Sequence, residues 1–256
     1  MNPVHLQTEV FSDKPALGHP LQSGAARLDH LVVAAANLDD GVAWCKKTLG
    51  IEPGPGGRHA LMGTHNRLFT IASEAYPLAY FEIIAIDPEA AAPGRPRWFG
   101  LDAQALRQRV VEQGPQFIHC VAAVSGLAAT SALTTSGRAL ADLGLDAGEV
   151  LDVSRPSTSG LLRWQMLVRP DGQTLCGGAM PTLIDWGQAS HPALQMPDSG
   201  VRLRSLRLAG LPPAVALHLG LPGVETVAAD TPEAAATAAL QAVFDTPLGR
   251  VVLSSN

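Results

Sequence analysis

Two segments of this sequence each carry a histidine and a carboxylate at matching places. His30 and His119 each lie in an early apolar stretch, and Glu82 and Asp185 each lie in a later one. Imidazole and carboxylate groups transfer protons and bind metal ions, so their pairing favours acid–base or metal chemistry. The repetition of the pair is the main functional signal in the sequence.

The surroundings of both histidines are apolar. Side chains alternate along a strand, so His30 would share a face with Leu28 and Val32, and the neighbours of His119 are equally apolar. An imidazole buried among apolar side chains costs free energy unless its nitrogens have a binding partner. That partner is either a hydrogen-bonding group of the core or a bound metal ion, and the sequence leaves both open.

A second polar cluster enters a strand at residues 63–67. Thr64, His65, Asn66 and Arg67 are consecutive, and together they suit a carboxylate or phosphate group of a ligand. Arginine pairs with such anions through two parallel hydrogen bonds. The alternative is a turn in which Thr64 and Asn66 bond the backbone.

Other side chains could line the same pocket. Tyr80 lies two residues before Glu82, so it shares a strand face with it and could bind a ligand. Trp164 lies in another predicted strand and would wall the cleft or pack in the core. Arg155 would either hold an anion or lie solvated at the surface.

The elements that carry these residues follow one order twice. The stretch 27–36 is rich in β-branched residues and predicts a strand, and Asn37 and Gly50 bound an amphipathic helix. Strands follow at 67–71 and 79–86. The second segment repeats this order from a strand at 117–124 to strands at 150–153, 161–168 and 181–186.

The repetition divides the chain into six parts. We expect a flexible arm at 1–26, a first strand–helix–three-strand (βαβββ) module at 27–90 and a second at 117–187, with linkers at 91–116 and 188–200. A third, degenerate module is expected at 201–256, because the order recurs there without the histidine or the acid. We expect it to be structural, as an edge or a dimer element.

The composition excludes several classes of binding partner. The net charge is −5 with no basic cluster, which argues against nucleic acid. No apolar stretch could span a bilayer, and the first 26 residues lack a secretory signal. The three cysteines form no C-x-x-C pair, which indicates reduced thiols in the cytoplasm. The glycines at 54–57 do not form G-x-G-x-x-G, so we expect no nucleotide cofactor. The charge pattern makes a small molecule the expected substrate.

Residues 27–192 resemble the glyoxalase-like domain proteins of the vicinal-oxygen-chelate superfamily. The resemblance rests on the paired βαβββ order and on short motifs, namely Leu28–Val33, Gly57–His59, Gly63–Leu68, Tyr80–Glu82, Ser154–Arg155, Arg163–Trp164, Leu183–Gly187 and His191–Pro192. It implies an α+β fold in which repeated βαβββ modules form curved mixed sheets around a cleft, with the helices on the outside. A homodimer is also expected.

The resemblance also implies a metal centre. The ligands of that superfamily come from the first and last strands of each module, which gives His30, Glu82, His119 and Asp185 here. Zn²⁺, Ni²⁺, Mn²⁺ or Fe²⁺ would suit this set, although Asp185 is one methylene shorter than the usual Glu. His65 could take the place of His119 as a ligand, and we expect Glu82 and His65 as catalytic residues.

The resemblance therefore predicts a metal-assisted lyase, isomerase or dioxygenase that acts on a small oxygen-rich substrate. The alternative is a metal-free protein of the same fold that binds and sequesters a small molecule. Arg67, Asn66, Thr64, Tyr80 and Trp164 are the expected substrate-binding residues in the first case.

Overall fold

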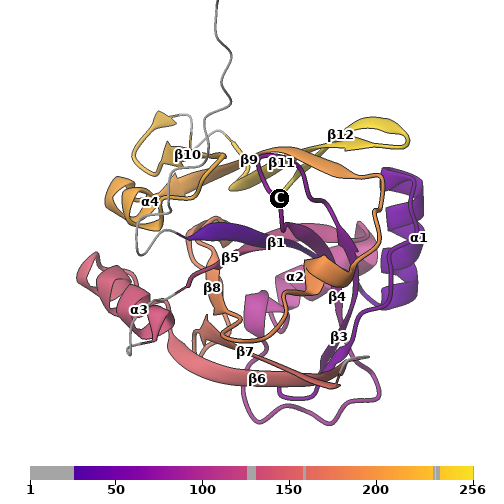
Figure 1. The fold of residues 1–256 in the computed structure, drawn as a ribbon, viewed down its shortest axis with the longest axis horizontal. Coiled ribbons are helices and arrows are strands. Elements are labelled where there is room, and N and C mark those ends of the chain that lie inside the picture. Colours follow the sequence, from indigo (N-terminus) through magenta and orange to yellow (C-terminus); the bar gives the residue numbers. More distant parts are fainter. Residues whose placement is uncertain (1–25, 126–130, 158–159, 233, 235–236, 256) are drawn as a thin grey trace, which may run out of the picture.

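The structure, a computed structural model, describes residues 26–125, 131–157, 160–232, 234 and 237–255 (Figure 1). The predicted arm therefore lies almost entirely outside the described residues. No helix in the described part of the chain is long and apolar enough to cross a membrane.

The first segment folds as strand, helix and three strands. Its elements are β1 (Arg27–Ala34), α1 (Leu38–Leu49), β2 (Arg58–His59), β3 (Thr64–Thr70) and β4 (Tyr80–Ile86). The helix begins where predicted, because the side chain of Asn37 accepts a hydrogen bond from the backbone N–H of Asp40. It ends at Gly50, whose φ of 73° places it in the left-handed region that favours glycine.

The second segment repeats this order. Its elements are β5 (Gln116–Ala123), α3 (Ala132–Asp142), β6 (Glu149–Ser157), β7 (Gly160–Val168) and β8 (Thr182–Asp185). All eight strands join one sheet in the order β2-β3-β4-β1-β5-β8-β7-β6. In each segment the first strand pairs in parallel with the last, and β1 and β5 join the halves in antiparallel fashion.

The eight-stranded sheet curls until its edge strands β2 and β6 contact each other. The predicted α+β fold, with curved mixed sheets around a cleft, is therefore confirmed. On the convex face lies a core that includes residues from α1 and α3 (Figure 1). The concave face holds a second core.

The stretch 91–116, expected as a linker, contributes to the concave core. It contains a turn of 3-10 helix, η1 (Trp98–Gly100), and the helix α2 (Gln104–Glu112). Trp98, Phe99, Leu106 and Val110 are buried there. This stretch was hard to recognise because it is polar overall and its few apolar residues pack across the sheet.

The last part of the chain covers the convex face. Its elements are β9 (Arg202–Leu211), α4 (Pro213–Leu219), β10 (Val224–Ala228), β11 (Leu240–Thr246) and β12 (Gly249–Ser254), and the short turns η2 (Cys176–Gly178) and η3 (Pro192–Gln195) precede it. Its four strands lie in the order β10-β9-β11-β12. Here the strand directly after the helix is the parallel partner of β9, whereas in the first two segments the last strand takes that place.

The packing of this smaller sheet predicts a large effect at Phe244. Its side chain is fully buried and its ring meets that of Phe81 on the larger sheet at 5.9 Å. Phe244→Ala should lower the free energy of unfolding by about 3–5 kcal/mol in urea titrations. Val252→Ala, on the same sheet but 52% exposed, is the matched control, and equal losses in both variants would contradict the packing role.

Candidate functional site

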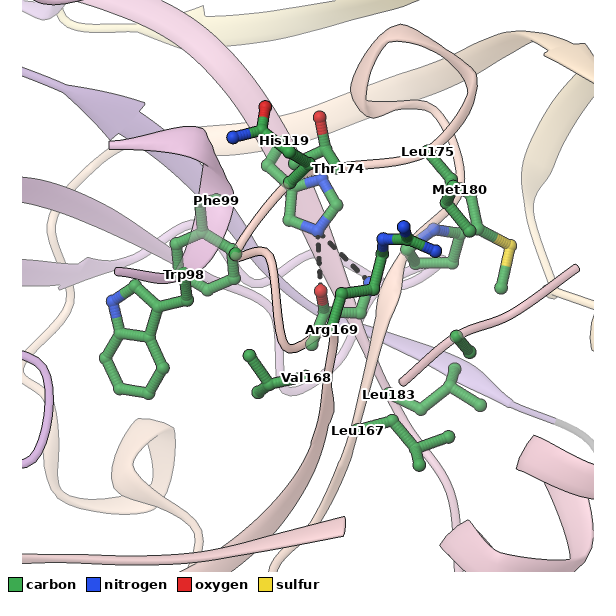
Figure 2. A pocket seen from close by; sticks show the side chains of 15 residues that line it. Trp98, Phe99, His119, Leu167, Val168, Arg169, Thr174, Leu175, Met180 and Leu183 are labelled. Carbon is green, nitrogen blue, oxygen red and sulfur yellow. Dashed lines mark hydrogen bonds between the residues drawn. The ribbon is translucent and has the colours of Figure 1, made fainter. Parts of the chain in front are cut away.

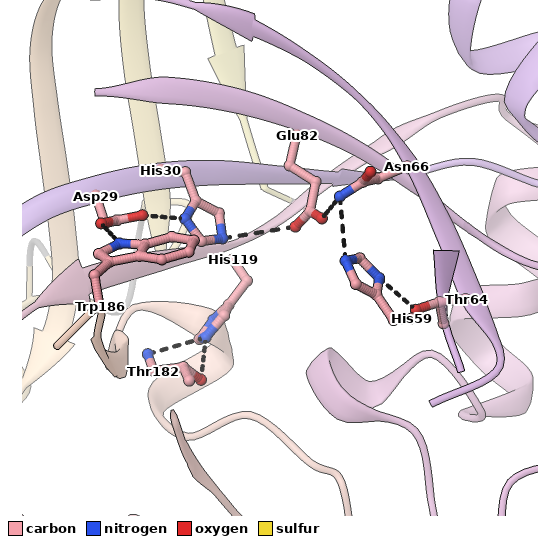
Figure 3. A network of polar contacts seen from close by, with 9 residues as sticks. All are labelled: Asp29, His30, His59, Thr64, Asn66, Glu82, His119, Thr182 and Trp186. Atoms are coloured by element: carbon pink, nitrogen blue, oxygen red, sulfur yellow. Dashed lines mark hydrogen bonds and ion pairs between the residues drawn. The ribbon is translucent and has the colours of Figure 1, made fainter. Parts of the chain in front are cut away.

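A buried polar cluster surrounds a small cavity on the concave face (Figure 3). Polar side chains from β1, β2, β3 and β4 lie on one side, and aromatic rings and Arg155 from other parts of the chain complete the wall. The residues that line it are His30, His59, Asn66, Leu68, Tyr80, Glu82, Trp98, Phe99, Arg155, Trp164, Met166, Ile184 and Trp186.

His30 and Glu82 face each other inside this cavity. Both are almost fully buried, and His30 Nε2 lies 3.6 Å from Glu82 Oε2. The parallel pairing of β1 with β4 sets Tyr80 opposite His30 and Glu82 opposite Val32, so all these side chains share the concave face. The ring of Tyr80 stacks on His30 at 4.5 Å.

Asp29 holds the other side of the His30 ring. Its fully buried carboxylate accepts hydrogen bonds from His30 Nδ1 at 2.6 Å, Trp186 Nε1 at 2.8 Å and His191 Nε2 at 2.9 Å. The pairing of β1 with β5 shifts register between Leu28 and His30. This irregularity allows neighbouring side chains to meet, although they would point to opposite faces of a regular strand.

The charge of Asp29 determines where the proton of His30 lies. Burial by itself would raise the pKa of Asp29, but the hydrogen bonds from His191 and His30 outweigh it and hold this pKa well below its usual value. An ionised carboxylate only accepts, so His30 carries a proton on Nδ1. In neutral His30 the lone pair of Nε2 would then face the acceptor Glu82 Oε2. Two facing acceptors require a proton or a cation between them.

The second oxygen of Glu82 is held by an amide. Asn66 Nδ2 donates to Glu82 Oε1 at 2.6 Å, and Asn66 Oδ1 accepts from the backbone N–H of Gly57 at 2.7 Å. His59 lies next to Asn66 on the side away from Glu82, and its Nδ1 donates to Thr64 Oγ1 at 3.0 Å. Burial, with the charge of Arg155, lowers the pKa of His59 to about 3, so its ring is neutral. Asn66 thus leaves Glu82 Oε2 aimed at the cavity.

The second half of the sheet repeats this arrangement with a hydroxyl in place of the acid. Thr182 pairs with Val121 as Glu82 pairs with Val32. His119 Nδ1 donates to the carbonyl of Gly178 at 2.9 Å, and its Nε2 accepts from the backbone N–H of Thr182 at 3.2 Å and contacts Thr182 Oγ1 at 2.9 Å. Both ring nitrogens are therefore engaged within the chain, and Figure 3 shows the contacts with Thr182.

His119 lines a neighbouring small cavity (Figure 2). Trp98 and Phe99 line this cavity and that of His30, and the Phe99 ring lies 5.1 Å from His119. Phe99 has a φ of 58°, which is costly for a bulky side chain and is retained where the surroundings impose it. These two residues separate the halves of the concave face.

The structure does not bring Asp185 into the cavity of His30. Its carboxylate accepts from the backbone N–H of Gly187 at 2.8 Å and lines a different cavity with Asp152 and Arg163. Asp185 lies three residues after Thr182, so strand alternation turns it away from the position equivalent to Glu82. The predicted four-ligand set is thus not assembled, because the register places Thr182 where Asp185 was expected.

The predicted cluster at residues 64–67 is divided between the two faces of β3. Thr64 and Asn66 point to the cavity side, where they contact His59. His65 instead approaches Asp87, with Nδ1 at 4.0 Å from Oδ1, and neither His65 nor Arg67 lines the cavity. Simple alternation along the strand separates residues that are consecutive in the sequence.

His30 and Glu82 fit one divalent ion as a pair of ligands. Metal bonds to imidazole and carboxylate are about 2.0–2.2 Å long, so two atoms 3.6 Å apart can share an ion. The carboxylate of Asp29 on the far nitrogen is the usual support for a metal-binding histidine. Among the described residues no group of three His, Cys, Asp or Glu side chains is arranged to hold a metal ion. Further ligands would have to come from substrate or water.

The sequence reasoning did not identify Asp29, His59, His191, Trp98 or Phe99 as site residues. His59 and His191 stand in the motifs Gly57–His59 and His191–Pro192, so that signal was available. Asp29 could not be found, because an ideal strand would turn it away from His30.

Burial of the neutral histidines predicts acid sensitivity. Burial lowers the pKa of His119 from 6.5 to about 3, so between these pH values the unfolded chain binds more protons than the folded one. The free energy of unfolding should therefore fall as the pH drops from about 6.5, by roughly 1.4 kcal/mol per pH unit for each such ring. Urea titrations should show a shallower fall for His119→Gln, and parallel curves for variant and wild type would contradict this.

Comparisons with known proteins locate the cavity within a recognised domain. A family model described as a glyoxalase-like domain matches residues 28–222, a range that includes every residue lining the cavity. No curated protein sequence matches the chain.

Solved structures resemble this chain only at low sequence identity and low TM-score. A hypothetical protein from Staphylococcus aureus has a TM-score of 0.48 at 16% identity, over 72% of this chain and 69% of its own. Methylmalonyl-CoA epimerase from Mycobacterium tuberculosis has a TM-score of 0.39 at 18% identity, over 65% and 92%. The hypothetical protein BH1468 from Bacillus halodurans has a TM-score of 0.34 at 12% identity, over 62% and 92%.

Proposed function

Since this chain belongs to the glyoxalase-like domain family, we propose that its concave cavity is the active site of a lyase or isomerase. The reaction is removal of a proton from a carbon beside a carbonyl group of a small oxygen-rich substrate, with Glu82 as the base. The observation that carries this proposal is the buried pair of facing acceptors, His30 Nε2 and Glu82 Oε2, at 3.6 Å.

The arrangement of Glu82 suits a base. Asn66 occupies Oε1 and so orients the carboxylate, while Oε2 faces the cavity. A base must reach its proton within hydrogen-bond distance, and a fixed carboxylate that faces the cavity meets that need without reorganisation. Tyr80 stacks on His30 beside it, and burial, together with the charges of Asp29 and Glu82, keeps the pKa of this phenol raised, so it stays neutral.

A divalent ion bound by His30 and Glu82 would supply Lewis-acid chemistry at the substrate oxygen. Glu82 Oε2 could take the proton only when it does not bind that ion, because Asn66 occupies Oε1. The residues of the chain contribute orientation: Asp29 fixes the His30 ring and Asn66 fixes Glu82. A dioxygenase of the facial-triad type needs a second histidine. The hydrogen bonds of His119 engage both its nitrogens, which favours a lyase or isomerase.

A second candidate is a protein that binds a small molecule without turnover. Trp98, Phe99, Trp164 and Trp186 all line the cavity, and such rings hold an apolar or planar ligand through stacking and burial. This role requires neither the base nor the metal.

Metal content tests the ligand pair. Wild-type protein loaded with Zn²⁺, Ni²⁺, Mn²⁺ or Fe²⁺ should retain a stoichiometric amount by elemental analysis. His30→Ala should lose it because half of the pair is gone. His119→Gln should keep it, since His119 is engaged elsewhere, and equal loss in both variants would contradict the assignment.

Removal of the base tests the reaction. Glu82→Gln keeps the shape of the side chain, so it should bind ligands but lose about 100- to 10,000-fold in the rate of solvent-deuterium exchange at substrate carbon. Proton NMR in deuterated water measures this exchange. Tight binding without exchange in the wild-type protein would favour the sequestering role.

A further inference from the structure

A groove of about 410 Å³ adjoins the cavity. Its wall is formed by the glycine-rich loop after α1, by residues of β3, β6 and β7, and by the segment 190–199. The apolar side chains that line it are Ile51, Pro55, Leu68, Phe69, Leu162, Pro192, Met196 and Pro197. Leu68 and Arg155 line both the groove and the cavity, so the two spaces meet at these residues.

Arg155 is the one charged residue of the groove wall without an ionic partner among the described residues. The other two are paired: Glu52 with Lys46 at 2.8 Å and Asp198 with Arg202 at 2.7 Å. A guanidinium is always charged and presents a planar set of donors that matches a carboxylate. The junction of groove and cavity therefore carries a guanidinium that is not held in an ion pair.

The glycine-rich loop makes room for this cation. A Cβ atom on Gly57 would lie 2.2 Å from Arg155 Nη1, and one on Gly56 would lie 2.1 Å from the backbone oxygen of Asn66. Any larger residue would push the guanidinium away or lift the loop from β3. The glycines thus hold the backbone against Asn66 and Arg155, where the groove opens into the cavity.

We propose that the substrate is an amphipathic carboxylate. Its carboxylate pairs with Arg155 at the junction, its apolar part lies in the groove, and its reacting carbon enters the cavity beside Glu82. This inference rests on the proposed function for the last of these placements. The lining supports it, because His30, His59, Asn66 and Glu82 give the cavity polar groups, whereas apolar side chains line most of the groove.

Straight-chain 2-oxocarboxylates of increasing length test the proposal. Binding can be followed by tryptophan fluorescence, because Trp98, Trp164 and Trp186 line the cavity. Affinity should rise about three- to fourfold for each added methylene that enters the groove. Arg155→Gln should weaken every member of the series by about 10- to 150-fold, since a charged hydrogen-bonded pair is lost.

Two further variants complete the test. Leu162→Gln places an amide on the groove wall opposite Arg155 in the β6–β7 pairing, so it should flatten the dependence on chain length. Arg163→Gln is the matched control, because Arg163 is exposed and lines the cavity of Asp185 instead. Affinity that does not change with length, or equal loss in Arg155→Gln and Arg163→Gln, would overturn the inference.

Deuterium exchange on the same ligands separates this inference from the proposed function. Length-dependent, Arg155-dependent binding without exchange would leave the amphipathic ligand standing and remove the proposed reaction. Deuterium exchange on short polar oxoacids, with no gain in affinity for longer chains, would support the proposed reaction and remove the amphipathic ligand.

Discussion

The buried carboxylate of Asp29 organises the concave face. It accepts hydrogen bonds from His30, Trp186 and His191, and these residues come from β1 and from the end of the second segment. A buried charge is costly unless it is paired and hydrogen-bonded, so the three donors must stay in place. The same carboxylate fixes the proton of His30 on Nδ1 and turns Nε2 toward Glu82. The orientation of His30 toward the proposed base Glu82 thus depends on the ionised carboxylate of Asp29, which does not itself line the cavity.

The two halves of the eight-stranded sheet have the same topology but different chemistry. In the first half, His30 Nε2 faces the carboxylate of Glu82. A cation or a proton must lie between these two acceptors. In the second half Thr182 satisfies His119 directly, and Trp98 and Phe99 stand between the halves. The second half therefore supplies walls, namely Trp164 and Arg155, rather than a second pair of ligands. This asymmetry leaves the facing histidine and carboxylate in the first half alone among the described residues, and the apolar groove adjoins their cavity.

Much of the fold could be predicted from local patterns. The helix from residue 38 was correctly bounded because its determinants, the cap at Asn37 and the left-handed turn at Gly50, act within a few residues. The repeated order of elements also followed from the pattern of strands, and the resemblance to a known family implied that His30 and Glu82 share one cavity. By contrast, the helix α2 was missed, since its apolar side chains are few and are stabilised by the concave core.

The sequence by itself determined the paired βαβββ order and the placement of His30 and Glu82 on the first and last strands of one module, because strand periodicity and turns are local properties. The tertiary structure decided which residue is equivalent to Glu82, since strand register in β8 places Thr182 there and not Asp185. It also separated His65 from Asn66 and brought Asp29 beside His30 through an irregular strand pair. Register and bulges depend on partners distant in the chain, and those partners cannot be identified from the local sequence.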